Sequence, residues 1–213
     1  MLKFKKKMSS ALLLTLALAA PAAPAQEVAP NVLLQSTTLE VIAAMKRERN
    51  LEAGRPSQVA SLVETKVLPL FDFPRMTQMA VARNWRVATP EQQAELTAEF
   101  RILLVRTYST ALSSYRDQTI EFRSMRSTPA DTEVTVKTVV KQSGTEPIAM
   151  NYDMVKTPAG WKVFDITVAG ISLVTTYRDS FSASVRDGGV DGLIKALADK
   201  NRQLGSRSAA PSS

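Results

Sequence analysis

Asp165 is the residue in this sequence best placed to take part in chemistry, because it interrupts an otherwise apolar stretch, WKVFDITV. Tyr108, Tyr152 and Tyr177 could place hydroxyl groups beside it, and a carboxylate with phenols can perform acid/base isomerisation in a cone-shaped α+β fold. The alternative is a buried carboxylate that is satisfied by the backbone, a tyrosine or an arginine such as Arg106. We favour the alternative, because nothing in the sequence supplies a nucleophile or a second base.

The sequence contains no histidine and no cysteine. Catalysis by Ser-His-Asp or Cys-His groups is therefore excluded, as are disulfides and zinc sites with histidine or cysteine ligands. Asp131, Glu133 and Asp153 are too scattered to indicate calcium binding. Gly188-Gly189 is typical of a break between helices, and no glycine-rich phosphate loop is present. We expect no metal and no cofactor.

The first 25 residues have the three parts of a secretory signal peptide. Four lysines lie within residues 3–7, an apolar block covers residues 11–20, and Ala23-Pro24-Ala25 matches a cleavage site. The apolar block is too short to span a hydrocarbon core of about 30 Å. Removal of this segment takes away four lysines and no acidic residue, so the net charge falls from +7 to +3. A charge of that size gives no electrostatic case for binding nucleic acid.

Hydrophobic spacing predicts helices over residues 31–49, 57–70, 74–86 and 89–115. The last of these has the strongest start signal, since Thr89 can cap it, Pro90 suits its first turn and Gln92 completes a capping box. Its apolar residues extend over much of its circumference. Such a helix is buried on more than one side or lines a cavity, and periodicity alone does not distinguish a packed core from a pocket lining.

Four strands are predicted next, over residues 119–127, 132–142, 147–157 and 161–168, joined by turns in an antiparallel meander. Within the last strand, strict alternation places Phe164, Ile166 and Val168 on one face and Trp161, Val163 and Asp165 on the other. After Gly170 the spacing becomes helical from Ile171 to Val185, and a final helix carries Leu193, Ile194 and Leu197.

The predicted fold class is therefore α+β, with N-terminal helices packed on a four-stranded antiparallel sheet, C-terminal helices, and an enclosed hydrophobic cavity. We expect a signal peptide at 1–25, one domain over 26–204, and a disordered tail at 205–213, where the residues are small and polar.

Three segments carry a resemblance to a known family. They are FDFPRMTQMAVARNW (71–85), ATPEQQAELTAEFRILLVRTYSTAL (88–112), and WKVFDITVAGISLVTTYRDSF (161–181) followed by GGVDGLIKALADKN (188–201). In this order they resemble the periplasmic phospholipid-binding MlaC proteins, also called the toluene-tolerance family. One departure is Ala169, where the family pattern leads us to expect an acidic residue before Gly170.

The resemblance implies a soluble periplasmic carrier of phospholipid that is not an enzyme and that maintains the lipid asymmetry of the outer membrane. Its implied partners are an outer-membrane lipoprotein–porin complex and an inner-membrane ABC transporter with a lipid-binding substrate domain. Acyl chains would lie between the sheet and the helices. The residues expected to line that cavity are Leu104, Tyr108, Val139, Met150, Tyr152, Val163, Ile166, Val168, Ile171 and Val174.

Two other functions stay open at this point. One is a small isomerase or hydrolase that uses Asp165, and the other is a secreted adaptor with a filled core and no ligand.

Overall fold

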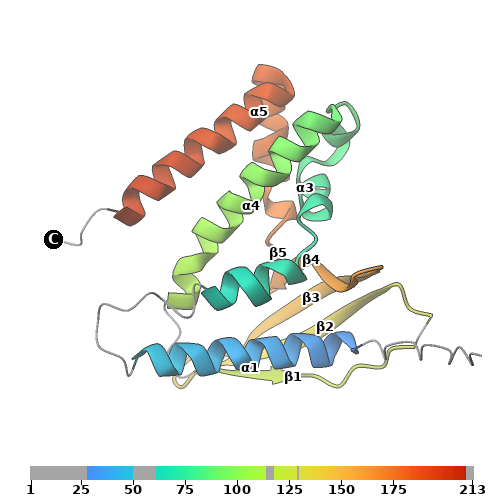
Figure 1. The fold of residues 1–213 in the computed structure, drawn as a ribbon, viewed down its shortest axis with the longest axis vertical. Coiled ribbons are helices and arrows are strands. Elements are labelled where there is room, and N and C mark those ends of the chain that lie inside the picture. The colour runs from blue at the N-terminus through green and yellow to red at the C-terminus, as the bar shows by residue number, and fades with distance from the viewer. Residues whose placement is uncertain (1–27, 50–60, 114–117, 129, 210–213) are drawn as a thin grey trace, which may run out of the picture.

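The structure is a computed structural model, and it describes residues 28–49, 61–113, 118–128 and 130–209 (Figure 1). The predicted signal peptide (1–25), the predicted start of the second helix at Ser57 and the last four residues lie outside this part of the chain. None of the helices in the described ranges is both long enough and apolar enough to cross a membrane.

Helices precede and follow an antiparallel sheet, which confirms the α+β class. The helical elements are α1 (Pro30–Arg49), the π-helix η1 (Val63–Val67), the 3-10 helix η2 (Leu68–Leu70), α3 (Phe73–Val81), the 3-10 helix η3 (Ala82–Arg86), α4 (Pro90–Ser113), the 3-10 helix η4 (Thr175–Tyr177) and α5 (Arg178–Ala209). The strands are β1 (Thr119–Phe122), β2 (Glu133–Lys141), β3 (Ile148–Thr157), β4 (Gly160–Val168) and β5 (Ile171–Ser172). The strands are hydrogen-bonded in sequence order, each antiparallel to the next.

The sheet has five strands rather than the four predicted, because the chain reverses at Ala169 and Gly170 instead of entering a helix. Both residues have positive φ, 50° and 85°, the backbone that a two-residue hairpin turn requires. Ile171 then pairs with Val168, and the Leu173 N–H donates to the Ile166 carbonyl at 2.8 Å. The helical elements begin at Thr175, so the predicted helix start at Ile171 was wrong.

Strand β4 also departs from strict alternation. Asp153 of β3 is opposite Asp165, yet the next residue, Met154, is opposite Val163, so Phe164 is an extra residue in a β-bulge. A bulge shifts the alternation by one position. Val163 and Ile166 therefore share a face, and the prediction that they lie on opposite faces was wrong.

The capping box at the start of α4 is confirmed. The Gln92 N–H donates to the Thr89 hydroxyl at 3.2 Å, and the Thr89 N–H donates to the Gln92 side chain at 3.0 Å. The predicted break at Gly188-Gly189 is present as a kink within α5, where Gly189 has φ 68° and ψ −167°. Beyond it, α5 continues through Gly205 to Ala209, into the segment that the sequence predicted as a disordered tail.

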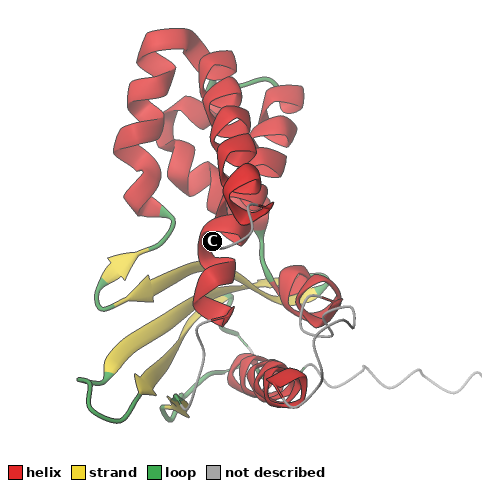
Figure 2. Cartoon of the chain, turned by 90° about the vertical axis from the view of Figure 1, so that its left-hand side faces the viewer, coloured by secondary structure: helices red, strands yellow, loops and turns green. Residues whose placement is uncertain are grey.

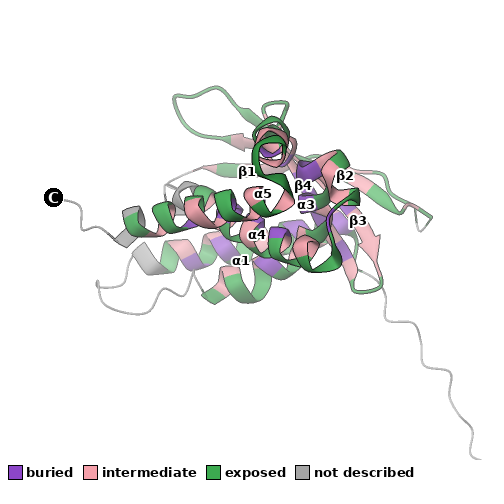
Figure 3. Cartoon of the chain, turned by 90° about the horizontal axis from the view of Figure 1, so that it is seen from above, coloured by how far each residue is buried: buried purple, intermediate pink, exposed green. Residues whose placement is uncertain are grey.

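Two apolar clusters hold the protein together. One lies among α3, α4 and α5, with Phe100 at its centre and the rings of Tyr177 and Phe181 edge-on to it at 5.1 and 5.2 Å. The other joins Leu34 of α1 to the sheet. Phe71 packs against both clusters. Along α1 and α4, buried patches alternate with exposed ones (Figure 3), as expected of amphipathic helices.

Helix α1 and the 61–70 segment lie on one side of the sheet (Figure 2). We call the side of the sheet that packs on α1 the inner face. The opposite, outer face carries polar side chains such as Thr135 and Asp153, whose hydroxyl and carboxylate are hydrogen-bonded at 2.6 Å. The fold thus gives the sheet one apolar face beneath helices and one polar face.

Candidate functional site

The inner face is built from rows of apolar side chains that cross the strands. Residues directly opposite one another in a sheet point to the same side, so the register fixes the rows. The first is Ile120, Val140 and Ile148; the second is Phe122, Thr138, Met150, Val168 and Ile171; the third is Val136, Tyr152 and Ile166; the fourth is Val134, Met154 and Val163. Apart from Tyr152, Thr138 is the only polar residue in these rows, and its hydroxyl donates to the Met150 carbonyl at 2.7 Å.

These rows are covered very unevenly. In the fourth row Met154 and Val163 are fully buried, at 0% exposure, whereas Ile148 in the first row is 44% exposed and Ile171 in the second is 63% exposed. Met150 between them is half-buried. The inner face is therefore closed at the Met154 end and open at the Ile148 end.

Tyr152 provides the main polar atom on this face. Its hydroxyl donates to the Met150 sulfur at 3.0 Å, a weak acceptor. Burial among apolar groups raises the pKa of Tyr152 to about 12, so the phenol is neutral at any physiological pH. The inner face therefore offers dispersion contacts and one weakly engaged hydroxyl group, with no fixed charge among the residues of the rows.

The structure divides the ten residues predicted to line the cavity. Five of them lie together on the inner face: Met150, Tyr152, Val163, Ile166 and Val168. Ile171 lies at the exposed edge of the same face.

The other four lie elsewhere. Leu104 and Val174 are buried in the helical cluster, and Tyr108 packs against it. The pKa of Tyr108 is raised to about 12, first by burial and then by the neighbouring Tyr177. Val139 is opposite Glu121 and Ala149, which places it on the outer face.

The predicted lining left out several residues of the sheet and of neighbouring segments that pack together at the inner face, namely Leu34, Phe122, Met125, Val134, Val136, Met154 and Trp161. Alternation within residues 132–142 did place Val134 and Val136 together, opposite to Val139. Both faces of that strand contain valine, however, so the pattern gave no basis for choosing between them.

Asp165 does not assemble an acid/base site with the tyrosines. It is 4% exposed; one carboxylate oxygen accepts from the N–H groups of Ile166 at 2.8 Å and Val174 at 3.4 Å, and the other accepts from the Ser172 hydroxyl at 2.6 Å. Tyr152 is on the inner face, whereas Asp165 is opposite Asp153 on the outer one. Asp165 is thus a buried carboxylate satisfied locally, and its bonds fix the β4–β5 hairpin and the entry to η4.

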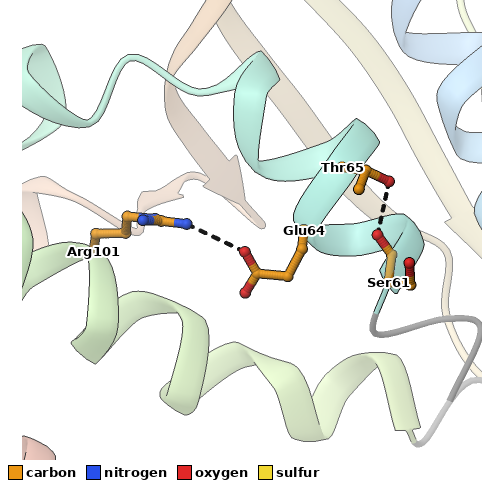
Figure 4. Close-up of polar contacts among 4 residues, drawn as sticks. All are labelled: Ser61, Glu64, Thr65 and Arg101. Atoms are coloured by element: carbon orange, nitrogen blue, oxygen red, sulfur yellow. Dashed lines mark hydrogen bonds and ion pairs between the residues drawn. The ribbon is translucent and has the colours of Figure 1, made fainter. Parts of the chain in front are cut away.

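The π-helix η1, on the same side of the sheet as α1, is tied to the helical unit by an ion pair. Glu64 in η1 lies 3.4 Å from the guanidinium of Arg101 in α4 (Figure 4). The side chains are 63% and 46% exposed, so the pair contributes about 1 kcal/mol at most. Thr65 is bonded within its own segment to the Ser61 carbonyl at 2.7 Å. No residue of η1 is buried, so burial of apolar side chains contributes little to holding η1 in place.

Two surface grooves lie on the helical unit, away from the inner face. One, of about 570 Å³, is lined by Asp72, Pro74, Arg75, Gln78, Met79 and Trp85. The second, of about 520 Å³, shares Pro74 and Trp85 and continues along α4 from Pro90 to Arg101. Among the described residues, no group of three or more histidine, cysteine, aspartate or glutamate side chains could hold a metal ion.

Comparison with known proteins gives the family. The family model described as MlaC protein matches residues 35–199. The chain belongs to the MlaC family. The match covers every described element from within α1 into the last part of α5. It includes the stretches 71–85, 88–112 and 161–181 that carried the resemblance, and all but the last two residues of 188–201.

Characterised relatives carry the family name or the toluene-tolerance name. The chain is 20% identical over 180 residues to the intermembrane phospholipid transport system binding protein MlaC of Haemophilus influenzae, covering 83% of this chain and 84% of that one. It is 24% identical over 164 residues to the toluene tolerance protein ttg2D of Pseudomonas putida, covering 76% and 75%.

A solved structure supports the same MlaC fold. The phospholipid-binding protein from Ralstonia solanacearum, solved in complex with a phospholipid, is 39% identical to this chain with a TM-score of 0.72. The similarity covers 82% of this chain and 98% of that one.

Proposed function

We propose that this protein is a periplasmic phospholipid carrier that holds acyl chains against the inner face of the sheet. The observation that carries the proposal is the uneven burial of that face, fully covered at Met154 and open at Ile148 and Ile171. Family membership and the phospholipid bound to the Ralstonia relative support the same ligand class.

The inner face suits a carrier energetically. Transfer of a chain of about 16 methylenes out of water gains about 0.8 kcal/mol for each, or on the order of 13 kcal/mol. Transfer from a bilayer gains almost nothing, because the chain already lies in hydrocarbon. Such a protein retains lipid in water and releases it at a membrane.

The partners that we propose are an outer-membrane lipoprotein–porin complex and an inner-membrane ABC transporter with a lipid-binding substrate domain. The support is membership of the MlaC family and the signal-peptide pattern of residues 1–25, which predicts export. Because binding is nearly neutral relative to a bilayer, net direction would come from the transporter and not from the carrier. The carrier would then contribute no catalysis, in line with Asp165 being engaged by Ser172 and backbone N–H groups.

Native mass spectrometry tests this proposal. The mature protein would be produced in a Gram-negative periplasm and purified without detergent. Its intact mass would be measured, and its bound lipid would be extracted and identified. The proposal predicts an added mass that matches diacyl phospholipid. A lipid-free mass that does not change after incubation with phospholipid vesicles would favour the ligand-free adaptor instead.

A further inference from the structure

At one end of the inner face, the apolar side chains are buried. Val136, Met154 and Val163 have no exposure, and Trp161 and Leu34 are each 6% exposed. All five belong to one apolar cluster that joins α1 to the sheet. We call this group the closed end. Its side chains are already packed against one another, which leaves no room there for a ligand.

The opposite end of the same face is accessible. Ile148 and Ile171 are 44% and 63% exposed, and Met150 and Val168 in the next row are half-buried. An acyl chain that lies on the inner face would enter from this end and run along the strands toward the closed end. In doing so it would pass Tyr152 and Ile166, which are half-buried.

The distance from the second row to the closed end is close to the length of one acyl chain. Met150 and Met154 are four residues apart in β3, or about 14 Å at about 3.4 Å per residue. One leaflet of a bilayer, which holds one chain length, is about 15 Å thick, half of a hydrocarbon core of about 30 Å. A chain that enters beside Met150 and Ile171, which share that row, therefore reaches the closed end with its terminal methyl group.

We infer that the closed end, through Met154 backed by Trp161, sets the length of the acyl chain that this protein accepts. This inference rests on the proposed function and specifies it further. Within the closed end, Met154 is the residue that an acyl chain running along β3 would meet next after Tyr152. It lies two positions beyond Tyr152 on the same face of that strand. Its unbranched side chain fills space that a shorter residue would leave open.

Substitutions at the closed end and one row before it should change the preferred acyl-chain length in opposite directions. Met154→Ala opens space beyond the present stop, so the protein should accept longer chains. Ile166→Phe adds volume one row nearer to the open end, so it should favour shorter chains. Val155→Ala is the matched control, because Val155 follows Met154 in β3 and points to the outer face, opposite Glu133 and Lys162.

The assay is a competition between lipids that differ only in chain length. Lipid-free protein and each variant would be incubated with an equimolar mixture of phosphatidylglycerols from didodecanoyl to dioctadecanoyl, and the bound species would be counted by native mass spectrometry. Each methylene that becomes accommodated is worth roughly a fourfold change in the bound ratio. Met154→Ala should therefore raise the ratio of bound octadecanoyl to tetradecanoyl lipid about tenfold or more over the wild type.

The outcomes distinguish a failure of the chain-length inference from a failure of the proposed carrier function. A rise for Met154→Ala and a fall for Ile166→Phe, with no change for Val155→Ala, would support the inference. An unchanged chain-length profile in lipid-bound Ile166→Phe and Met154→Ala would overturn it and leave the carrier function intact. If circular dichroism shows that Met154→Ala does not fold, the Ile166→Phe profile decides alone. Wild-type protein that binds none of these lipids would instead contradict the proposed function, and the inference with it.

Discussion

A charge placed on the inner face should empty the protein of lipid, whereas the same charge on the outer face should not. Ile166 is half-buried in the row of Tyr152 and Val136, and Val139 is half-buried on the opposite side of the sheet. The two substitutions Ile166→Glu and Val139→Glu therefore exchange similar residues for the same carboxylate. They differ in the face to which that carboxylate points.

The expected effect is large because the acyl chain would bury the carboxylate. Removing an ion from water without a partner costs several kcal/mol. A cost of about 4 kcal/mol weakens binding roughly a thousandfold. Val139→Glu places its carboxylate between Lys137 and Lys141, both exposed on the outer face, and should leave affinity within about threefold of the wild type.

The assay is lipid content after purification, measured by native mass spectrometry, together with the affinity for a fluorescent phospholipid. Ile166→Gln controls for loss of apolar area without charge and should retain part of the binding. Binding by Ile166→Glu should recover as the pH falls toward the ordinary glutamate value of about 4.3, since the neutral acid is cheaper to bury. If Ile166→Glu stays fully loaded, or if Val139→Glu loses lipid to the same degree, the acyl chain does not lie on the inner face.

Three further predictions concern stability and titration. Burial raises the pKa of Tyr152 to about 12 from about 10 in the unfolded chain. Tyr152 therefore contributes about 3 kcal/mol to the free energy of unfolding, which is present below pH 10 and lost as the pH rises toward 12. Ultraviolet titration should show one tyrosine that ionises late and that is absent from Tyr152→Phe. Thr89→Ala removes the acceptor of the Gln92 N–H and should lower the free energy of unfolding by about 1 kcal/mol, and a urea midpoint equal to the wild type would contradict this. Gly189→Ala forces a side chain into a backbone of φ 68° and should cost about 1–3 kcal/mol, whereas Gly188→Ala, where φ is not positive, should be neutral or slightly stabilising.

Sequence patterns predicted the elements well where the local signal was strong. The capping box placed the start of α4 at Thr89 and Pro90, as the reciprocal hydrogen bonds of Thr89 and Gln92 confirm. Alternation placed β2 and β3 within one or two residues of their observed bounds. These features depend on neighbouring residues, which is why the sequence alone reveals them.

The errors lie where geometry depends on a partner strand. An extra residue such as Phe164 is invisible to alternation, because a bulge exists only relative to β3. Ala169 has no glycine-like signal for its positive φ, and so the hairpin before Ile171 resembled the start of a helix. Alternation likewise offered no ground for preferring Val136 to Val139 on the inner face. The structure thus brings five of the ten predicted lining residues together on the inner face, and their contact with lipid stays a prediction.

Photocrosslinking of a bound lipid shows directly whether the acyl chain lies on the inner face of the sheet. The mature protein would be loaded with a phospholipid that carries a diazirine near the middle of one acyl chain, irradiated, digested and analysed by mass spectrometry. If the acyl chain lies on the inner face, crosslinks should form at Met150, Tyr152 or Ile166. Crosslinks confined to the grooves beside Trp85, or to outer-face residues such as Val139, would show that the acyl chain lies elsewhere and that the proposed binding face is wrong.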